Sequence, residues 1–468
     1  MVARSRGAGA AVGVAVAISL VAGCGAGGGA TTTAPEPNRA GSISAADVGA
    51  IDCAPYDQYG DLSGATVTSY GGPLLPPMVQ AYDEAWAAFE RCTGVDVQAE
   101  WSGGFEYDLV VRVEAGDAPD VAMLTQPAYL ASIVNDTGAV VPLGDQAETV
   151  AREGFGEDWL RYGRVNGEQY AFPFAGASSK SLVWYSPRAF AQAGYEVPAR
   201  WDELLALSDR IVGDHPDGSV KPWCAGIEEG SATGWPLTDW VEDVMLRQQG
   251  PDYYDDWVSH AVPFNAAESV EVWEAVGSVL RNPAYVNGGI GDVASIAEVS
   301  FTQAGLPILD GDCMMTKSAS FLAPFWPQGT TIAEDGDVFA FPFPSPTEAE
   351  PGFVLAAGNY VAAFDDRPEV QAFMLYLASE DFHATTDTEA FGFVSPHNAV
   401  TAGLMTSSLG RLVAQQFQQP DVIVRFDGSD LMPGAVGAGA FWSEGTAWVA
   451  DGTETQATLD AIEASWPS

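Results

Sequence analysis

Aromatic side chains in loops, next to polar residues, are the groups of this sequence most suited to ligand chemistry. The chain contains 14 Trp, 15 Tyr and 22 Phe residues, and most of them must pack in a core. Three clusters fit a core less well because glycine or proline interrupts or precedes them: residues 233–240, residues 324–327 and the pair 441–442. A flat ring can stack on the C–H face of a pyranose, while carboxylates, amides and cations pair with its hydroxyls. The candidates for stacking on a sugar, each with core packing as the alternative, are therefore Trp235, Trp326 and Trp442.

The local motifs of the common enzyme classes are absent from the sequence. It contains no G-x-S-x-G nucleophile turn, no G-x-x-x-x-G-K phosphate loop and no H-E-x-x-H zinc helix. The pair Asp335 and Asp337 lacks the further oxygen ligands of a calcium loop. The histidines are too far apart in sequence for a local metal site: His215, His260, His383 and His397. We therefore expect no catalytic residue, no metal and no other cofactor. Two carboxylates meeting in a cleft, as in a glycosidase, remain an alternative because the chain is rich in acids.

The first residues have the features of an export signal. Arg4 and Arg6 precede an apolar run that ends in the small-residue site Val21-Ala-Gly-Cys24, and this order is typical of a secretory signal peptide. A cysteine at that site resembles the bacterial lipobox, in which the thiol is acylated and becomes the new N-terminus. We expect residues 1–24 to be a lipoprotein signal peptide with Cys24 as the lipidation site, followed by a flexible tether over residues 25–60. An ordinary signal peptide that happens to contain a cysteine is the alternative.

The length of the chain predicts its division into lobes, and its net charge narrows the classes of partner. A body of about 400 residues follows the tether, which exceeds the usual size of one compact core and favours two lobes. The net charge is −44, from 63 acidic and 19 basic side chains. Such a surface repels nucleic acid and anionic lipid, so we expect neither as a partner and interpret the charge as a source of solubility.

The five cysteines suit an exported protein. With Cys24 lipidated, four remain, and sequence alone does not choose among their three pairings. We expect a Cys53–Cys92 disulfide, which would pin the start of the body to its first helix, and a Cys224–Cys313 disulfide. Four buried thiols are the alternative.

Periodicity predicts alternating strands and helices at the start of the body. Strands are expected at 65–70, 96–101 and 119–124, with helices at 78–92 and from 109 onward. A β-α-β-α-β order implies parallel strands joined by crossover helices. Helices dominate the middle of the chain. After it we expect strands at 338–341 and 353–364, helices at 368–379 and 441–450, and a last helix that ends at Trp466.

Several stretches, taken in order, resemble the extracellular solute-binding proteins of ABC sugar importers, and among them the binding proteins of α-glucoside import systems. The general family pattern is carried by four segments: Glu114–Val121, Val165–Pro173, Leu182–Ser186 and Pro198–Leu204. The α-glucoside branch is indicated by four more: Trp223–Gly226, Thr233–Asp243, Gly311–Met314 and Arg425–Pro433, which leads into Phe441 and Trp442. The resemblance extends from Val67 to the C-terminus. Cys224 and Cys313 both lie inside matched motifs, which supports their pairing.

The resemblance implies an α/β fold of the periplasmic-binding-protein type (type II), with two lobes, a ligand cleft between them and three hinge crossings. The crossings are expected near Pro173, Phe341 and Phe391. The lobes would then consist of residues 61–173 with 342–391, and of residues 174–341 with 392–468.

Family roles transferred to matching positions, together with the aromatic clusters, give a set of expected ligand-binding residues. Phe321 stands where maltose binders often carry a tryptophan, which implies a rearranged stacking platform or a different sugar. Asn359 follows Ala357 and Gly358, where the family has paired glycines. Arg425 and Asp430 have two interpretations, a ligand contact or a structural ion pair. The full set is Tyr70, Gly71, Phe105, Glu106, Gln126, Lys180, Trp235, Asp239, Phe321, Trp326, Asn359, Arg425, Asp430 and Trp442.

The expected function is that of the substrate-binding component of an ABC transporter for carbohydrate uptake. The ligand would be an oligosaccharide, such as a maltose- or trehalose-type α-glucoside, bound between the lobes and delivered to the permease subunits. We expect a non-enzymatic monomer, attached by its N-terminal lipid to the outer face of the cell membrane. The alternatives are a binding protein for a non-sugar solute, such as a polyamine or a peptide, and a secreted glycoside hydrolase.

Overall fold

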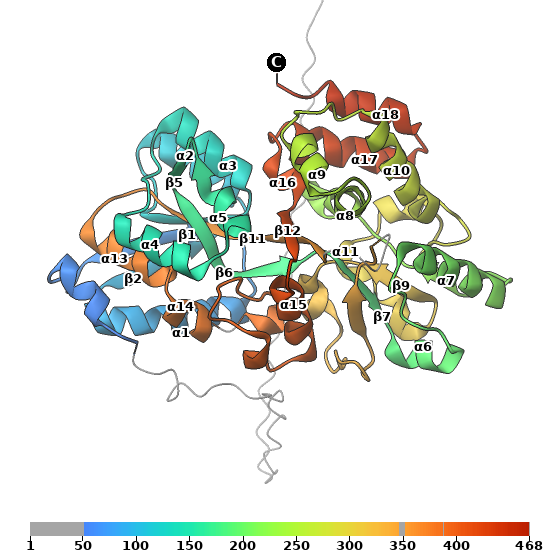
Figure 1. Ribbon diagram of the computed structural model, residues 1–468, viewed down its shortest axis with the longest axis horizontal. Helices are drawn as coiled ribbons and strands as arrows, with labels where there is room; N and C mark the ends of the chain where they lie inside the picture. Colours follow the sequence, from blue (N-terminus) through green and yellow to red (C-terminus); the bar gives the residue numbers. More distant parts are fainter. Residues whose placement is uncertain (1–50, 346–351, 387, 468) are drawn as a thin grey trace, which may run out of the picture. The chain divides into compact units, whose positions relative to one another are not determined.

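The computed structural model describes residues 51–345, 352–386 and 388–467, which fold into two main sheets flanked by helices (Figure 1). The expected signal peptide, the lipidation site Cys24 and the tether up to residue 50 lie outside these residues. Within the described residues, no helix has both the length and the apolar character needed to cross a membrane. The chain has the predicted α/β fold with two lobes, one built around each main sheet.

The six-stranded sheet forms the core of the first lobe. Its strands follow the order β12-β11-β3-β1-β2, and β6 also pairs with β11. The predicted β-α-β-α-β unit is confirmed, because β1 pairs in parallel with both β2 and β3. The strands are β1 (Thr66–Gly71), β2 (Asp96–Trp101), β3 (Val121–Leu124), β6 (Ala171–Ser179), β11 (Phe353–Ala363) and β12 (Ile423–Phe426), and β4 (Arg164–Val165) with β5 (Glu168–Gln169) form a separate short pair.

Proline and glycine set the limits of the first helix. It begins at Pro76 and ends before Gly94, whose φ of 73° is left-handed; proline in the first turn and glycine at the C-cap are typical of helix ends. The stripe of Met78, Tyr82, Trp86 and Phe89 is buried, which accounts for the helix predicted at 78–92. The helices of this lobe are α1 (Pro76–Thr93), α2 (Phe105–Ala115), α3 (Pro127–Thr137), α4 (Asp145–Gly154), α5 (Glu157–Leu160), α13 (Pro368–Leu377) and α14 (Glu380–Thr385).

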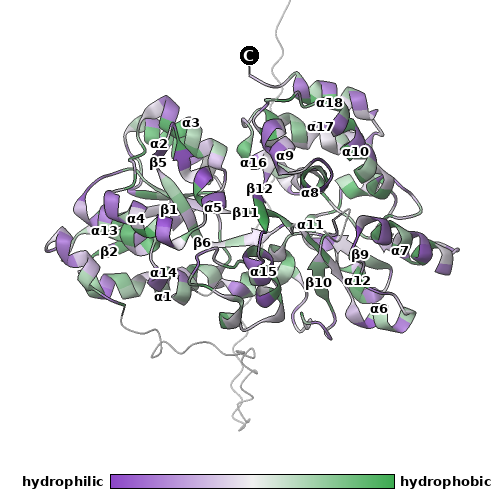
Figure 2. Cartoon of the chain, viewed as in Figure 1, coloured by the Kyte–Doolittle hydropathy of each residue, from purple (hydrophilic) through white to green (hydrophobic). Residues whose placement is uncertain are grey.

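The four-stranded sheet of the second lobe has the order β10-β7-β9-β8. Figure 2 shows hydrophobic residues along β10 and hydrophilic residues on the surface helix α7. The strands are β7 (Leu182–Tyr185), β8 (Lys221–Trp223), β9 (Cys313–Lys317) and β10 (Phe339–Pro342). The helices that follow β7 along the chain, α13 and α14 aside, are α6 (Pro187–Ala193), α7 (Trp201–Asp214), α8 (Trp235–Gln249), α9 (Pro251–Val258), α10 (Ala267–Leu280), α11 (Phe301–Ala304), α12 (Pro307–Asp310), α15 (Ser408–Gln418), α16 (Gly428–Leu431), α17 (Trp442–Ala450) and α18 (Thr455–Glu463). A π-helix at Val436–Phe441 leads directly into α17, so the helix predicted at 441–450 begins at Trp442.

Within the described residues, three segments join the six-stranded sheet to the second lobe. The chain leaves the six-stranded sheet after β6 through Lys180 and Ser181, it returns between β10 and β11, and it leaves again from β12 into α16. The exact lobe boundaries stay a prediction. β12 departs from them, because residues 423–426 pair in parallel with residues 353–356 of the six-stranded sheet although the boundaries assign them to the second lobe.

Both expected disulfides are confirmed. Cys53 is bonded to Cys92 near the end of α1, and Cys224 to Cys313 at the start of β9, with Cα–Cα distances of 5.3 and 5.8 Å. The bonds close loops with sequence separations of 39 and 89 residues. In the loop-entropy account, they lower the entropy of the unfolded chain by amounts equivalent to about 4 and about 4.6 kcal/mol, respectively.

Candidate functional site

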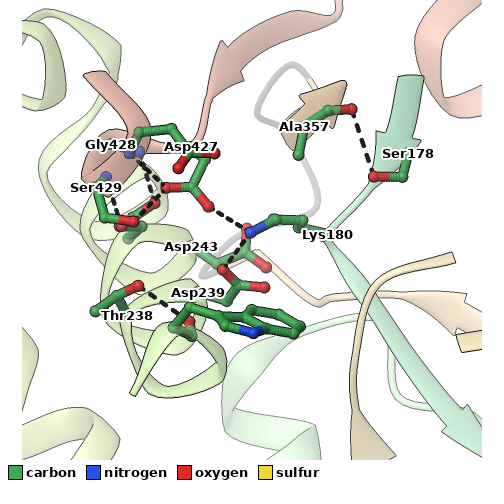
Figure 3. A network of polar contacts seen from close by, with 12 residues as sticks. Ser178, Lys180, Thr238, Asp239, Asp243, Ala357, Asp427, Gly428 and Ser429 are labelled. Atoms are coloured by element: carbon green, nitrogen blue, oxygen red, sulfur yellow. Dashed lines mark hydrogen bonds and ion pairs between the residues drawn. The ribbon is translucent and has the colours of Figure 1, made fainter. Parts of the chain in front are cut away.

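A buried lysine at the first connection joins three segments of the chain. Lys180 Nζ donates to Asp239 Oδ1 of α8 at 2.8 Å and is ion-paired with Asp427, the N-cap residue of α16. The three side chains are only 6, 4 and 2 % exposed. Figure 3 shows Lys180 reaching between the two aspartates. The Trp235 ring lies beside the ammonium, 4.8 Å from its centroid to Nζ, a distance that suits a cation–π contact.

The charges of this group follow from burial and from mutual pairing. Burial lowers the pKa of the Lys180 ammonium, but the carboxylates of Asp239 and Asp427 outweigh it and raise that pKa well above its usual value. Burial raises the pKa of Asp239 to about 7 in spite of Lys180. Burial also acts to raise the pKa of Asp427, but the Lys180 ammonium and the Ser429 hydroxyl bring it below its usual range. Lys180 and Asp427 therefore stabilise each other in the charged form.

A second polar contact links the two lobes. Gln126, the N-cap residue of α3, donates through Nε2 to Asp430 Oδ1 of α16 at 3.2 Å. Burial, together with the charge of Asp427, raises the pKa of Asp430 well above its usual value. Gly71 is the last residue of β1, and Gln126 follows the end of the parallel strand β3. Asn359 of β11 directly precedes Tyr360, which pairs with Leu124 at the end of β3. Three of the expected ligand-binding residues therefore lie at one edge of the six-stranded sheet, facing the same end as α16.

Aromatic rings from separate segments meet next to Lys180. The Trp235 ring contacts those of Phe301 and Phe321, with centroids 4.9 and 5.7 Å apart, and Phe321 stacks on Phe393 at 6.1 Å. Trp235, Phe321 and Phe393 are half-buried, so each keeps part of its ring accessible. These rings form what we call the aromatic wall: Trp235, Phe301, Phe321 and Phe393.

Gly234 brings Trp442 to this wall. Its φ is 115°, and a Cβ at this position would lie 2.4 Å from the carbonyl oxygen of Trp442, so only glycine lets the two segments approach. Trp442 is half-buried at the start of α17. Two of the three candidate stacking tryptophans therefore belong to neighbouring backbone segments.

Other expected ligand-binding residues lie in the core. Trp326 is 7 % exposed and packs on Trp184 of β7, with ring centroids 5.8 Å apart. Phe105 is fully buried against Tyr70, itself 2 % exposed, at 5.1 Å. Packing accounts for these three rings, and a ligand contact by any of them stays a prediction. Glu106 lies in the first turn of α2.

Arg425 forms structural ion pairs, but not with Asp430. Its Nε donates to Asp255 Oδ1 of α9 at 2.8 Å, and its guanidinium lies 3.6 Å from Asp158 of α5. The side chain is 9 % exposed. Of the two interpretations left open by the sequence, these contacts favour the structural one for Arg425.

Sequence reasoning passed over several residues of this region. Asp427 lies inside the matched segment 425–433 but was not singled out, and Lys317 ends a fully buried strand, where a cation is unusual. Lys317 Nζ donates to the carbonyl oxygens of Lys180 and Asp239 at 3.2 and 3.1 Å. Phe301 and Phe393 carried no local signal, because only the tertiary fold places them beside Trp235.

Two cavities lie away from this region. One, of about 420 Å³, is bordered by β10, the start of β11 and residues 197–199. The other, of about 560 Å³, is lined by residues 156–159, 395–398 and the end of α15. Neither is lined by an expected ligand-binding residue. The candidate site is therefore the region where the aromatic wall, Lys180, Asp430, Gln126 and Trp442 converge.

Two α/β lobes joined by three connections define the periplasmic-binding-protein fold, which the chain shares with solved solute receptors. Residues 72–383 match the family described as bacterial extracellular solute-binding protein, and the chain belongs to this family. The resemblance drawn from the sequence motifs is thereby confirmed.

Two curated relatives align over most of their length. The osmoprotective compounds-binding protein GgtB of Synechocystis sp. is 38% identical over 401 residues, which cover 85% of this chain and 91% of the relative. The α-glucosides-binding periplasmic protein AglE of Rhizobium meliloti is 35% identical over 416 residues, 87% of this chain and 88% of the relative.

Solved structures with low sequence identity share the fold. The bacterial solute receptor AcbH, with a described preference for β-D-galactopyranose, matches with a TM-score of 0.70 at 15% identity, over 86% of this chain and 98% of its own. A maltose-bound protein of T. maritima matches with a TM-score of 0.63 at 16% identity, over 86% and 98% of the two chains.

Proposed function

We propose that this protein is the substrate-binding component of an ABC importer and that its ligand is a carbohydrate. The observation that carries the proposal is the aromatic wall, with three half-buried rings, next to the charged and amide groups of Lys180, Asp430 and Gln126. Rings of this kind suit the apolar faces of a pyranose, and the polar groups suit its hydroxyls.

The ligand we favour is an α-glucoside of short length, of the maltose or trehalose type. One relative, 35% identical, is named for binding α-glucosides, and another, 38% identical, for binding osmoprotective compounds. The motifs of residues 233–243 and 425–433, which indicated the α-glucoside branch, supply Trp235 and Asp430 to the candidate site.

Binding would act through the two lobes. A ligand that touches the aromatic wall on one side and the edge of β1 and β3 on the other binds the closed arrangement more tightly than the open one, and so shifts the population toward it. The closed form would be recognised by the permease, with transport driven by a separate ATPase. The proposal includes export of the chain, acylation of Cys24 and attachment to the outer face of the membrane.

A thermal-shift screen of the full chain tests the proposal. Maltose, trehalose, other mono- to trisaccharides and spermidine are added separately at increasing concentration. A true ligand at 100 times its Kd raises the unfolding free energy by about 2.7 kcal/mol, and the midpoint rises with it. A shift with spermidine alone would identify a polyamine-binding protein instead. Recovery of shortened sugar after incubation would identify a hydrolase.

A further inference from the structure

One face of α8 is charged where a helix in this position is normally apolar. Asp239, Glu242, Asp243 and Arg247 follow the spacing i, i+3, i+4 and i+8, which places them on the same face. All four are buried, with exposed fractions of 3, 0, 0 and 5 %. Because taking charges out of water is costly, and an apolar face would pack without that cost, stability alone does not account for this face.

Two of these residues hold the first connection between the lobes. Asp239 binds the ammonium of Lys180, and Asp243 Oδ1 accepts a hydrogen bond from Ser181 Oγ at 2.8 Å. The same Ser181 Oγ accepts from the backbone N–H of Leu355, also at 2.8 Å, and thereby joins the first connection to the start of β11.

The other two residues hold the remaining connections. Arg247 Nη2 donates to the carbonyl oxygen of Phe353, the first residue of β11, at 2.8 Å. Glu242 accepts hydrogen bonds from the N–H groups of Gly428 and Ser429, at 2.7 and 3.0 Å, where the chain leaves β12. One helix therefore contacts all three segments that join the lobes.

Two cations, one on α8 itself and one on the strand β9, balance a carboxylate of this face. Arg247 and Lys317 both form ion pairs with Asp243, the latter at 3.3 Å. Each carboxylate thus has a charged or hydrogen-bonding partner while the connections keep these positions. A connection that moved away would leave a buried charge without its partner, which is strongly unfavourable.

We propose that the charged face of α8, formed by Asp239, Glu242, Asp243 and Arg247, is a hinge clasp that fixes the three connections to the second lobe and sets the balance between open and closed arrangements. The proposal rests on the proposed function in assuming that closure accompanies binding. Apparent affinity scales with the population of the binding-competent arrangement. The clasp residues are therefore positioning residues: they act on ligand binding through the population of the closed arrangement and need not contact the ligand.

The test measures the distance between the lobes without ligand. Spin labels are placed on cysteines introduced at the exposed positions Tyr107 of α2 and Glu271 of α10. The full chain also carries Cys24→Ser, which removes the cysteine outside the two disulfides, and the four paired cysteines have no free thiol to react. Ser181→Ala removes the hydroxyl that joins Asp243 to Leu355, and Glu242→Gln removes one of the two carboxyl oxygens that accept from Gly428 and Ser429 at the third connection. We expect both variants to broaden the distribution of distances between the two spin labels and to raise the Kd for the sugar by about 5- to 10-fold. Ser181→Thr, which keeps the hydroxyl, should show the distance distribution and the Kd of the parent protein.

A matched control separates the clasp from general loss of stability. Ser208→Ala removes a buried hydroxyl of the same lobe that accepts from Trp223 Nε1 at 3.0 Å and touches no connection. It should lower the melting temperature without changing the distances. If Glu242→Gln does not fold, Ser181→Ala decides alone. Unchanged distances in the folded variants would overturn the clasp, and this outcome does not depend on which ligand the protein binds.

Discussion

The candidate stacking tryptophans differ in exposure, and this difference makes a prediction. Trp442 and Trp235 are half-buried, and Trp235 lies beside the Lys180 ammonium, whereas Trp326 is 7 % exposed in the core. We expect Trp442→Ala and Trp235→Ala to weaken sugar binding at least 10-fold, about 1.4 kcal/mol or more, because each removes a ring face available to the ligand. Isothermal calorimetry measures the effect.

Trp326→Ala is the control for these two variants. Loss of a buried tryptophan should cost about 3–5 kcal/mol of unfolding free energy and leave the Kd of the surviving folded protein unchanged. Full sugar binding by Trp442→Ala would show that the stacking surface has been placed wrongly.

Two stacked histidines of the first lobe predict sensitivity to acid. Burial lowers the pKa of His383 to about 3, and burial lowers the pKa of His397 to about 4. Their rings lie 5.1 Å apart. In the unfolded chain both would titrate near 6.5, so between about pH 6.5 and 4 the unfolded state binds more protons and stability falls as pH falls.

Denaturant unfolding at several pH values checks this expectation. His383 alone contributes a slope of at most about 1.4 kcal/mol per pH unit in that window. The double variant His383→Gln/His397→Gln should lose this part of the slope while keeping the part due to carboxylates. An identical slope in the variant and the parent would mean that neither histidine is neutral in the folded protein.

At the scale of elements, Arg425 fixes β12 to helices of both lobes. It binds Asp255 of α9, which also accepts from Arg161 at 3.1 Å, and it lies near Asp158 of α5. Tyr162 and Tyr254 bind the N–H and carbonyl oxygen of the next residue, Phe426, at 3.0 and 2.9 Å. Arg425→Gln and Asp255→Asn should therefore have similar effects, a loss of about 1–3 kcal/mol of unfolding free energy.

Comparing the affinities of these two variants decides the role of Arg425. A structural ion pair predicts that both change sugar affinity equally, whereas a ligand contact predicts that Arg425→Gln weakens binding far more than Asp255→Asn. Unfolding in urea and calorimetry with the sugar provide the two measurements.

Local sequence patterns predicted the elements well where neighbours along the chain determine them. The strands and helices of residues 65–124 follow from alternation, helical periodicity and Pro or Gly at the helix ends. The position of β12 could not be predicted, because Ile423–Phe426 pairs with a strand about 70 residues earlier and a run of four residues, three of them apolar, carries no partner information. The aromatic wall is a similar case, since Phe301 and Phe393 meet Trp235 only in the folded chain.

The same limit applied to the polar part of the site. Lys180, Asp239 and Asp430 were expected from the family resemblance, but their pairing with one another and with Asp427 depends on how three connections converge on α8. Burial, which decides that Trp326 and Phe105 are core residues, is likewise a property of the tertiary fold.

At the scale of the whole molecule, the net charge of −44 predicts a dependence on salt that also distinguishes the ligand classes. Repulsion among so many carboxylates destabilises the compact state at low ionic strength, where the Debye length is about 30 Å at 0.01 M. The melting temperature should therefore rise as sodium chloride is increased from about 10 mM to 500 mM, where screening shortens this length to a few Å.

Binding of a neutral sugar changes no charge, so its Kd should stay within about twofold over the same range. Binding of spermidine to an acidic site would instead weaken steeply with salt, because screening removes its electrostatic attraction. Scanning calorimetry and titration calorimetry at matched salt concentrations test both parts, and a steep salt dependence of the Kd would favour a cationic solute over a carbohydrate.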